Sequence, residues 1–140
     1  MPTSSKVLCT VYALTAIAAL VATGSQNVAY LDSGVNLYLA FFNDTKVNAA
    51  SRSMTVDIFL LTLPVVILMV AEARKNSVRF VWVYVLLAFV TAISVTFPLF
   101  LIARELRIGK TDPTHLRMAD AIPLAIFGVF IAALSVWCVT

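Results

Sequence analysis

Charged residues are scarce in this sequence. They make up 12% of its 140 residues, hydrophobic residues make up 61%, and the mean hydropathy is +0.98. A soluble domain carries about 25% charged residues, so this chain lacks the polar surface that a soluble globule needs. Lipid must therefore be the main solvent of its side chains. The length leaves room for one domain, residues 1–140.

Residues that build metal, haem and nucleophilic sites are also scarce. The chain has two cysteines, Cys9 and Cys138, and one histidine, His115, and their spacing matches no metal-ligand motif. It contains neither a glycine-rich phosphate loop nor a nucleophile elbow. The absence of a long basic face interleaved with aromatic residues argues against nucleic-acid binding. We expect no metal and no cofactor, and the lipid bilayer as a partner.

What the sequence does have is four apolar segments, at residues 7–23, 54–71, 80–103 and 122–139. Crossing a hydrocarbon core of about 30 Å takes about 20 helical residues. The sequence therefore predicts an all-α integral membrane protein, a four-helix transmembrane bundle. A cleaved signal peptide is the alternative for the first segment, because Lys6 precedes the apolar run.

The segment 35–42 is apolar but too short to cross a membrane. Its aromatic residues, Tyr38, Phe41 and Phe42, favour an interfacial position between the first and second spans. A pocket lid or a re-entrant segment is the alternative.

The third segment, 80–103, holds 24 residues and no charge. Its length predicts one continuous transmembrane helix. Polar residues and Pro98 recur on one face at spacings of three and four, which indicates a stripe that faces protein. This makes Tyr84, Thr91 and Ser94 candidate binding residues, together with Arg104 directly after the segment.

Asp57 is the leading candidate for chemistry. It lies about one turn inside the second span, where a charge costs up to about 2.5–3.5 kcal/mol at the bilayer centre. Burial without a counter-ion would make it a proton donor. The alternative is an interfacial residue that caps the helix or pairs with Arg52 or Lys46.

A short polar turn joins the second and third spans, so these helices should be antiparallel neighbours. The end of the third would then lie beside the start of the second. This predicts Arg104 and Glu105 near Asp57, with Arg104 a possible counter-ion and Glu105 a possible second acid. Glu72 would lie near Arg74. Structural ion pairing is the alternative to catalysis.

Prolines and small residues mark expected structural positions. Pro64 should kink the second span, and Pro98 should free a backbone carbonyl near Ser94. In the last span Gly128 belongs to a small-residue face suited to close helix contact, which also includes Ala125, Ala132 and Ser135.

The stretches SRSMTVDIFL, VAEARK and FPLFLIARE resemble a family of small bacterial membrane proteins catalogued as a domain of unknown function, number 2834. The resemblance covers roughly Val7–Leu106 and leaves the last span outside it. It implies a multi-pass protein, with no known activity, in a membrane that would be the bacterial inner membrane. The positions that carry it are Asp57, Glu72, Arg74, Pro98, Arg104 and Glu105.

The basic residues do not decide the orientation of the four predicted spans in the membrane. The start of the chain and the second loop hold four basic residues, and the first and third loops hold six, a total that favours outside termini. The first span alone favours inside termini, because Lys6 precedes it and no basic residue follows closely.

Three functions fit these observations. The first is a non-catalytic accessory or stabilising subunit of a larger membrane complex, with other subunits or further copies of the chain as partners. The second is a membrane-embedded enzyme on an isoprenoid or lipid substrate, resembling terpene cyclases, with Asp57 as the acid. The third is a small proton-coupled transporter component that uses the same residue.

Overall fold

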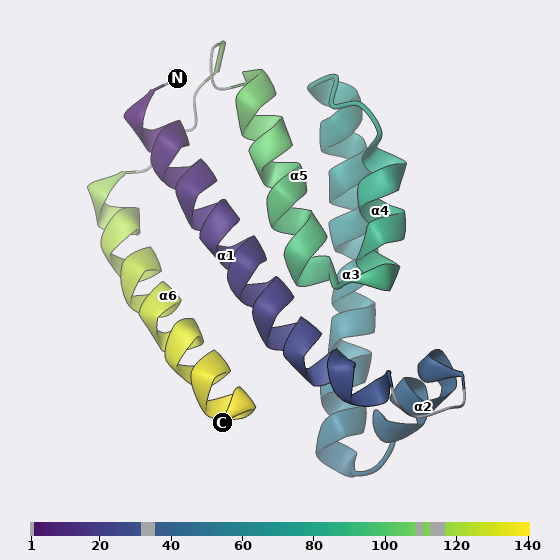
Figure 1. Cartoon of the computed structure of the whole chain (residues 1–140). Coiled ribbons are helices and arrows are strands. Elements are labelled where there is room, and N and C mark those ends of the chain that lie inside the picture. Colours follow the sequence, from purple (N-terminus) through teal and green to yellow (C-terminus); the bar gives the residue numbers. More distant parts are fainter. Residues whose placement is uncertain (1, 32–35, 109–110, 113–116) are drawn as a thin grey trace.

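The computed structural model describes residues 2–31, 36–108, 111–112 and 117–140. All regular structure in these ranges is helical, which confirms the all-α prediction (Figure 1). In chain order the elements are α1 (Thr3–Asn27), the 3-10 turn η1 (Val28–Tyr30), α2 (Leu37–Asp44), α3 (Ala49–Lys75), α4 (Val81–Val90), α5 (Ile93–Ile108) and α6 (Met118–Val139).

Three stretches of the described chain are long and apolar enough to cross a membrane: Thr3–Tyr30, Ala49–Lys75 and Met118–Val139. They contain the predicted segments 7–23, 54–71 and 122–139. Asn48 begins α3, since its side chain accepts a hydrogen bond of 2.8 Å from the Ser51 amide. Pro64 lies inside the same helix.

The prediction of one continuous helix over 80–103 is wrong. The helix α4 ends at Val90, the chain reverses at Thr91–Ala92, and α5 begins at Ile93. Figure 1 shows α4 and α5 side by side, with their outer ends at the same end of the bundle. At 1.5 Å per residue they are about 15 Å and 24 Å long, so neither covers a core of about 30 Å.

Two features of the sequence weaken the helix at this point. Val90, Thr91, Ile93, Val95 and Thr96 are β-branched, and such residues lose side-chain freedom in a helix. Pro98 offers no amide to the carbonyl of the residue four positions earlier, so a continuous helix would lack one hydrogen bond here. An apolar segment can therefore turn back at little local cost.

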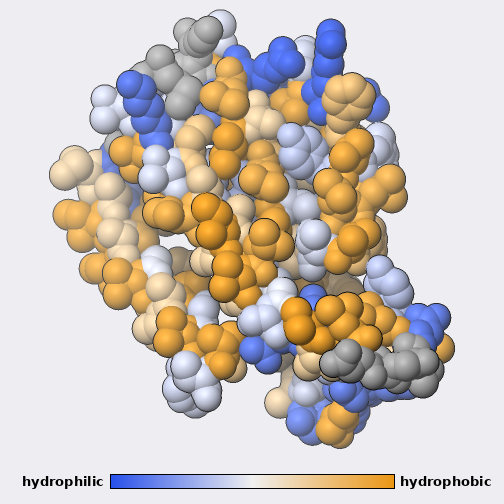
Figure 2. Space-filling model, viewed as in Figure 1, coloured by the Kyte–Doolittle hydropathy of each residue, from blue (hydrophilic) through white to orange (hydrophobic). Residues whose placement is uncertain are grey.

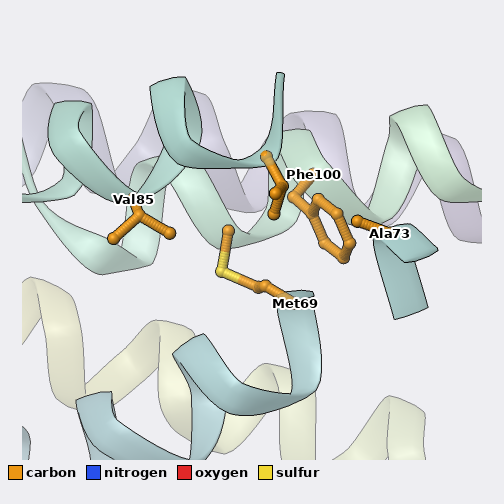
Figure 3. Close-up of a cluster of buried hydrophobic side chains, with 5 residues drawn as sticks. Met69, Ala73, Val85 and Phe100 are labelled. Atoms are coloured by element: carbon orange, nitrogen blue, oxygen red, sulfur yellow. The ribbon is translucent and has the colours of Figure 1, made fainter. Parts of the chain in front are cut away.

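The core lies between α3, α4 and α5. Phe100 of α5 and Met69 of α3 are fully buried, and Ala73, Val81 and Val85 complete the cluster. Figure 3 shows the Phe100 ring close to Ala73 and Met69. Because α5 also packs along α1, it is the helix that α1, α3 and α4 all contact.

Elsewhere the molecule is open. Figure 2 shows hydrophobic residues over much of the visible face, with hydrophilic residues mainly toward its two ends. In α6 no residue is buried, and this helix touches α1 only lightly. These exposed apolar surfaces fit a protein whose solvent is lipid.

The short helix α2 lies at the opposite end of the bundle from the start of α4 and the end of α5 (Figure 1). Tyr30 holds it in place, since its hydroxyl donates a hydrogen bond of 2.8 Å to Asp44 and its ring meets Phe41 edge to face at 5.7 Å. An interfacial position for this segment stays a prediction.

Candidate functional site

The most polar feature of the packed region is a group of three charged residues and one asparagine where α3 and α5 end: Glu72, Arg104, Glu105 and Asn76. We call it the ionic cluster. Arg104 donates through Nε to Glu72 Oε2 and through Nη1, at 3.3 Å, to Glu105 Oε1. Glu72 and Arg104 are mostly buried, with side-chain exposures of 20% and 26%, and Glu105 is only 2% exposed. One guanidinium therefore bridges a partly exposed carboxylate, that of Glu72, and a buried one, that of Glu105.

Helix geometry positions these groups. Asn76 follows the last turn of α3, and its side-chain amide donates at 3.0 Å both to Glu72 Oε2 and to the Glu72 carbonyl. These bonds orient the carboxylate toward α5. Arg104 and Glu105 are adjacent in α5, so one points toward α3 and the other lies deeper in the bundle.

The start of α1 covers Glu105. Ser5 is fully buried, and its hydroxyl has no hydrogen-bond partner among the described residues. Cys9 and Tyr12 lie one and two turns further along α1, on the same face of the helix as Ser5. The ionic cluster thus joins α3 to α5 beneath the beginning of α1.

The predicted grouping of Arg104 and Glu105 with Asp57 is wrong. Because the chain reverses at Thr91–Ala92, α5 ends beside the end of α3, and Arg104 pairs with Glu72. Fifteen residues of helix, about 22 Å, separate Glu72 from Asp57. Glu72 does lie near Arg74, since both belong to the end of α3, but its ion pair is with Arg104.

Asp57 itself is exposed on α3. It lines neither the depression that includes Tyr30 and Phe41 nor the one that includes Arg74 and Arg79. Catalysis or proton transfer by Asp57, and a catalytic role for Glu105, stay predictions that this geometry does not test.

The reversal at Thr91–Ala92 separates the residues of the predicted binding stripe. Tyr84 packs edge to face on Phe100 at 5.9 Å between ring centres. Thr91 sits at the reversal, where its hydroxyl donates to the Leu87 carbonyl at 2.9 Å. Ser94 is exposed and Pro98 is buried. These residues do not share one lining.

The arrangement suits structural charge pairing. Buried charges persist when they are paired and hydrogen-bonded, and the ionic cluster meets this condition with residues from two helices. Within the described ranges no group of three or more histidine, cysteine, aspartate or glutamate residues is placed to hold a metal ion.

Comparison with known proteins places the chain in a family. The model of the family described as "Protein of unknown function DUF2834" matches residues 11–106. The chain belongs to this family. No curated protein matches it, and no solved structure does.

The matched region confirms the resemblance seen in the sequence and its extent. It begins within α1 and ends within α5, so it contains the α4–α5 reversal and the charged residues of the ionic cluster. The helix α6 lies outside it. The matched region therefore contains the residues that build the core of this chain.

Sequence reasoning missed the partners that only folding brings near. Asn76 had a weak signal, as a polar residue one turn after Glu72. Ser5, Cys9 and Tyr12 recur at spacings of four and three along α1, which is the signal of one helix face. Nothing local indicated which helix that face would meet.

Proposed function

We propose that this DUF2834 member is a small polytopic protein of the bacterial inner membrane that serves as a non-catalytic accessory or stabilising subunit of a larger membrane complex. The observation that carries the proposal is the exposure of α6. This helix is 22 residues long and apolar enough to cross a membrane, and none of the residues in its most apolar window is buried against the rest of the chain.

The small-residue face of α6 supports contact with another helix. A Cβ added at Gly128 would meet nothing within 4 Å, so this notch is open. Helices in lipid gain no hydrophobic advantage by pairing, and their contacts depend on small residues that allow backbones to approach closely. An open face of this kind on a span outside the family region fits a subunit interface.

The rest of the fold supports a scaffold. The Phe100 core and the ionic cluster both tie α5 to its neighbours. They leave the face of α6 free while fixing the three helices around α5. The second and third functions suggested by the sequence depend on Asp57, and no contact of the described residues favours them.

The test is purification of the tagged chain in mild detergent from its native membrane. The proposal expects a complex larger than the chain, which Gly128→Leu breaks up. Because the glycine has open space around it, this substitution should leave the chain's own melting temperature unchanged. Phe130→Leu is the matched control, since Phe130 lies on the opposite face of α6 and is also exposed.

A chain that runs alone at its own size before any substitution would refute the accessory role. A complex that contains only further copies of the chain would replace it with self-association. A complex that survives Gly128→Leu would remove this face from the interface.

A further inference from the structure

The connection between α3 and α4 forms a shallow depression at the end of the bundle where α3 ends. It is near the ionic cluster but shares no residue with it. Its volume is about 500 Å³ and its lining runs from Ala73 to Trp82. We call it the α3–α4 depression.

The backbone of this connection is held in a defined shape. Ser77 has φ of 54° and the Val78 amide donates to the Ala73 carbonyl at 3.0 Å, which together form the C-terminal capping arrangement known as a Schellman motif. Phe80 has φ of 60° and directly precedes α4. These turns place Arg74 and Arg79 on the lining of one depression.

The two arginines carry uncompensated charge. Neither forms an ion pair within the described part of the chain, and the nearby Glu72 is occupied by Arg104. The lining contains no acidic residue. Guanidinium groups bind phosphate oxygens through two parallel hydrogen bonds, so an anion with a phosphate group is the complementary ligand.

The other side of the depression is apolar and aromatic. Phe80 is 75% exposed and Trp82 is 53% exposed, and both line it. Aromatic rings in such positions are typical of the membrane–water boundary. A ligand that offers a phosphate to the arginines and hydrocarbon to the rings is a phospholipid.

We propose that the α3–α4 depression binds the headgroup of an anionic phospholipid, with Arg74 and Arg79 on its phosphate and with Phe80 and Trp82 against its glycerol and upper acyl chains. Basic pockets next to membrane helices are known to select anionic lipids over zwitterionic ones. This binding is independent of the accessory role, since it needs neither α6 nor a partner protein.

The test uses the two tryptophans as local reporters. The full chain with Trp137→Phe keeps only Trp82, at the depression, and the full chain with Trp82→Phe keeps only Trp137, near the end of α6. Each is reconstituted into vesicles of equal phosphatidylglycerol and phosphatidylcholine, in which one or the other lipid carries brominated chains. Bromine quenches a tryptophan that it touches, so the ratio of the two quenching values reports the local lipid composition.

The proposal expects stronger quenching of Trp82 by brominated phosphatidylglycerol, with an enrichment of about fivefold per arginine, and no preference at Trp137. The preference should disappear in Arg74→Gln/Arg79→Gln. The preference should persist in Lys46→Gln/Arg52→Gln, which removes the same charge at the other end of the bundle. A weaker preference should remain in Arg74→Lys/Arg79→Lys. Unchanged circular dichroism confirms that each variant is folded.

Equal quenching of Trp82 by both lipids would overturn the proposal. A preference that survives Arg74→Gln/Arg79→Gln would also overturn it, because the attraction would then belong to the membrane surface as a whole. Loss of the preference in inorganic phosphate, but not in chloride of equal ionic strength, would show a free-phosphate site instead.

Discussion

Arg104 shows how a single residue organises this protein. It meets Glu72 from α3 and Glu105 from its own helix, and the second carboxylate is almost inaccessible. Removal of one member of a buried charge pair leaves an uncompensated charge, which is more costly than the pair itself. The chain's stability should therefore depend on Arg104 far more than on other basic residues nearby.

We expect Arg104→Gln to destabilise the protein by about 1–3 kcal/mol, because Glu72 and Glu105 would each lose a charged hydrogen-bond donor. Thermal unfolding in detergent measures this. Arg107→Gln is the matched control, since Arg107 is exposed in the last turn of α5 and should change stability by no more than about 0.5 kcal/mol. Equal melting temperatures for the two variants would contradict a structural role for the ionic cluster.

Ser77 is the second residue whose effect can be stated. It occupies the left-handed position of the capping motif after α3, where φ is 54°, and glycine adopts this conformation without the steric cost that a Cβ brings. Ser77→Gly should raise stability by up to about 1 kcal/mol. Ser53→Gly, within α3 and also exposed, should lower it, because glycine weakens a regular helix. Thermal unfolding in detergent measures both variants. A lower stability of Ser77→Gly would contradict the left-handed conformation of Ser77.

At the scale of the element, the α4–α5 hairpin is the decisive feature. Its two helices are individually too short to cross a membrane, but α5 contacts α1, α3 and α4. The existence of a helix on either side of Thr91 followed from hydropathy. The reversal did not, since β-branched residues and Pro98 permit a break without requiring one, and many spans contain both.

Phe100→Ala tests the packing that holds this hairpin. In lipid the transfer of a phenyl ring from the core to the surroundings contributes little, because lipid tails are as apolar as the core. The remaining cost is the cavity, at about 24 cal/mol per Å³, or roughly 2 kcal/mol for a ring of this size. Leu99→Ala is the control, because Leu99 is 42% exposed and leaves no cavity. Similar stabilities for the two variants would refute the core assigned here.

At the scale of the whole molecule, the hairpin changes the distribution of charge. The start of α1, the end of α3, the start of α4, the end of α5 and the start of α6 lie at one end of the bundle (Figure 1). Most described basic residues flank these points: Lys6, Arg74, Lys75, Arg79, Arg104, Arg107 and Arg117. At the other end the described basic residues are Lys46 and Arg52.

Basic loops remain in the cytoplasm, so we expect the start of α1 inside, both ends of the α4–α5 hairpin inside, and the end of α6 outside. Single thiols report this in sealed right-side-out membrane vesicles. The native Cys138, in a Cys9→Ala chain, should react with an impermeant maleimide at once. The Ser77→Cys and Asp112→Cys thiols, with both native cysteines removed, should react only after permeabilisation.

Four complete crossings would give a different pattern. The Ser77→Cys thiol would then react like Cys138, and the Asp112→Cys thiol would lie on the opposite side. That result would refute the re-entrant hairpin. A fully inverted pattern would keep the hairpin and refute the orientation.

The sequence by itself determined that the chain forms helices apolar enough to cross a membrane, and which family it belongs to, because hydropathy, helical length and motif spacing are local properties of the chain. The same information placed the last span outside the family region. It also marked Glu72, Arg104 and Glu105 as residues of interest without indicating how they pair.

Only the tertiary structure decided that pairing. A reversal inside an apolar segment leaves the hydropathy of that segment unchanged, so a count of apolar residues along the chain cannot detect it. Contacts between distant residues, such as Phe100 with Met69 and Arg104 with Glu72, favour the turned-back arrangement. Once α5 turns back, the charges that follow it move to the opposite end of the molecule, and both the ionic cluster and the expected orientation follow from that one bend.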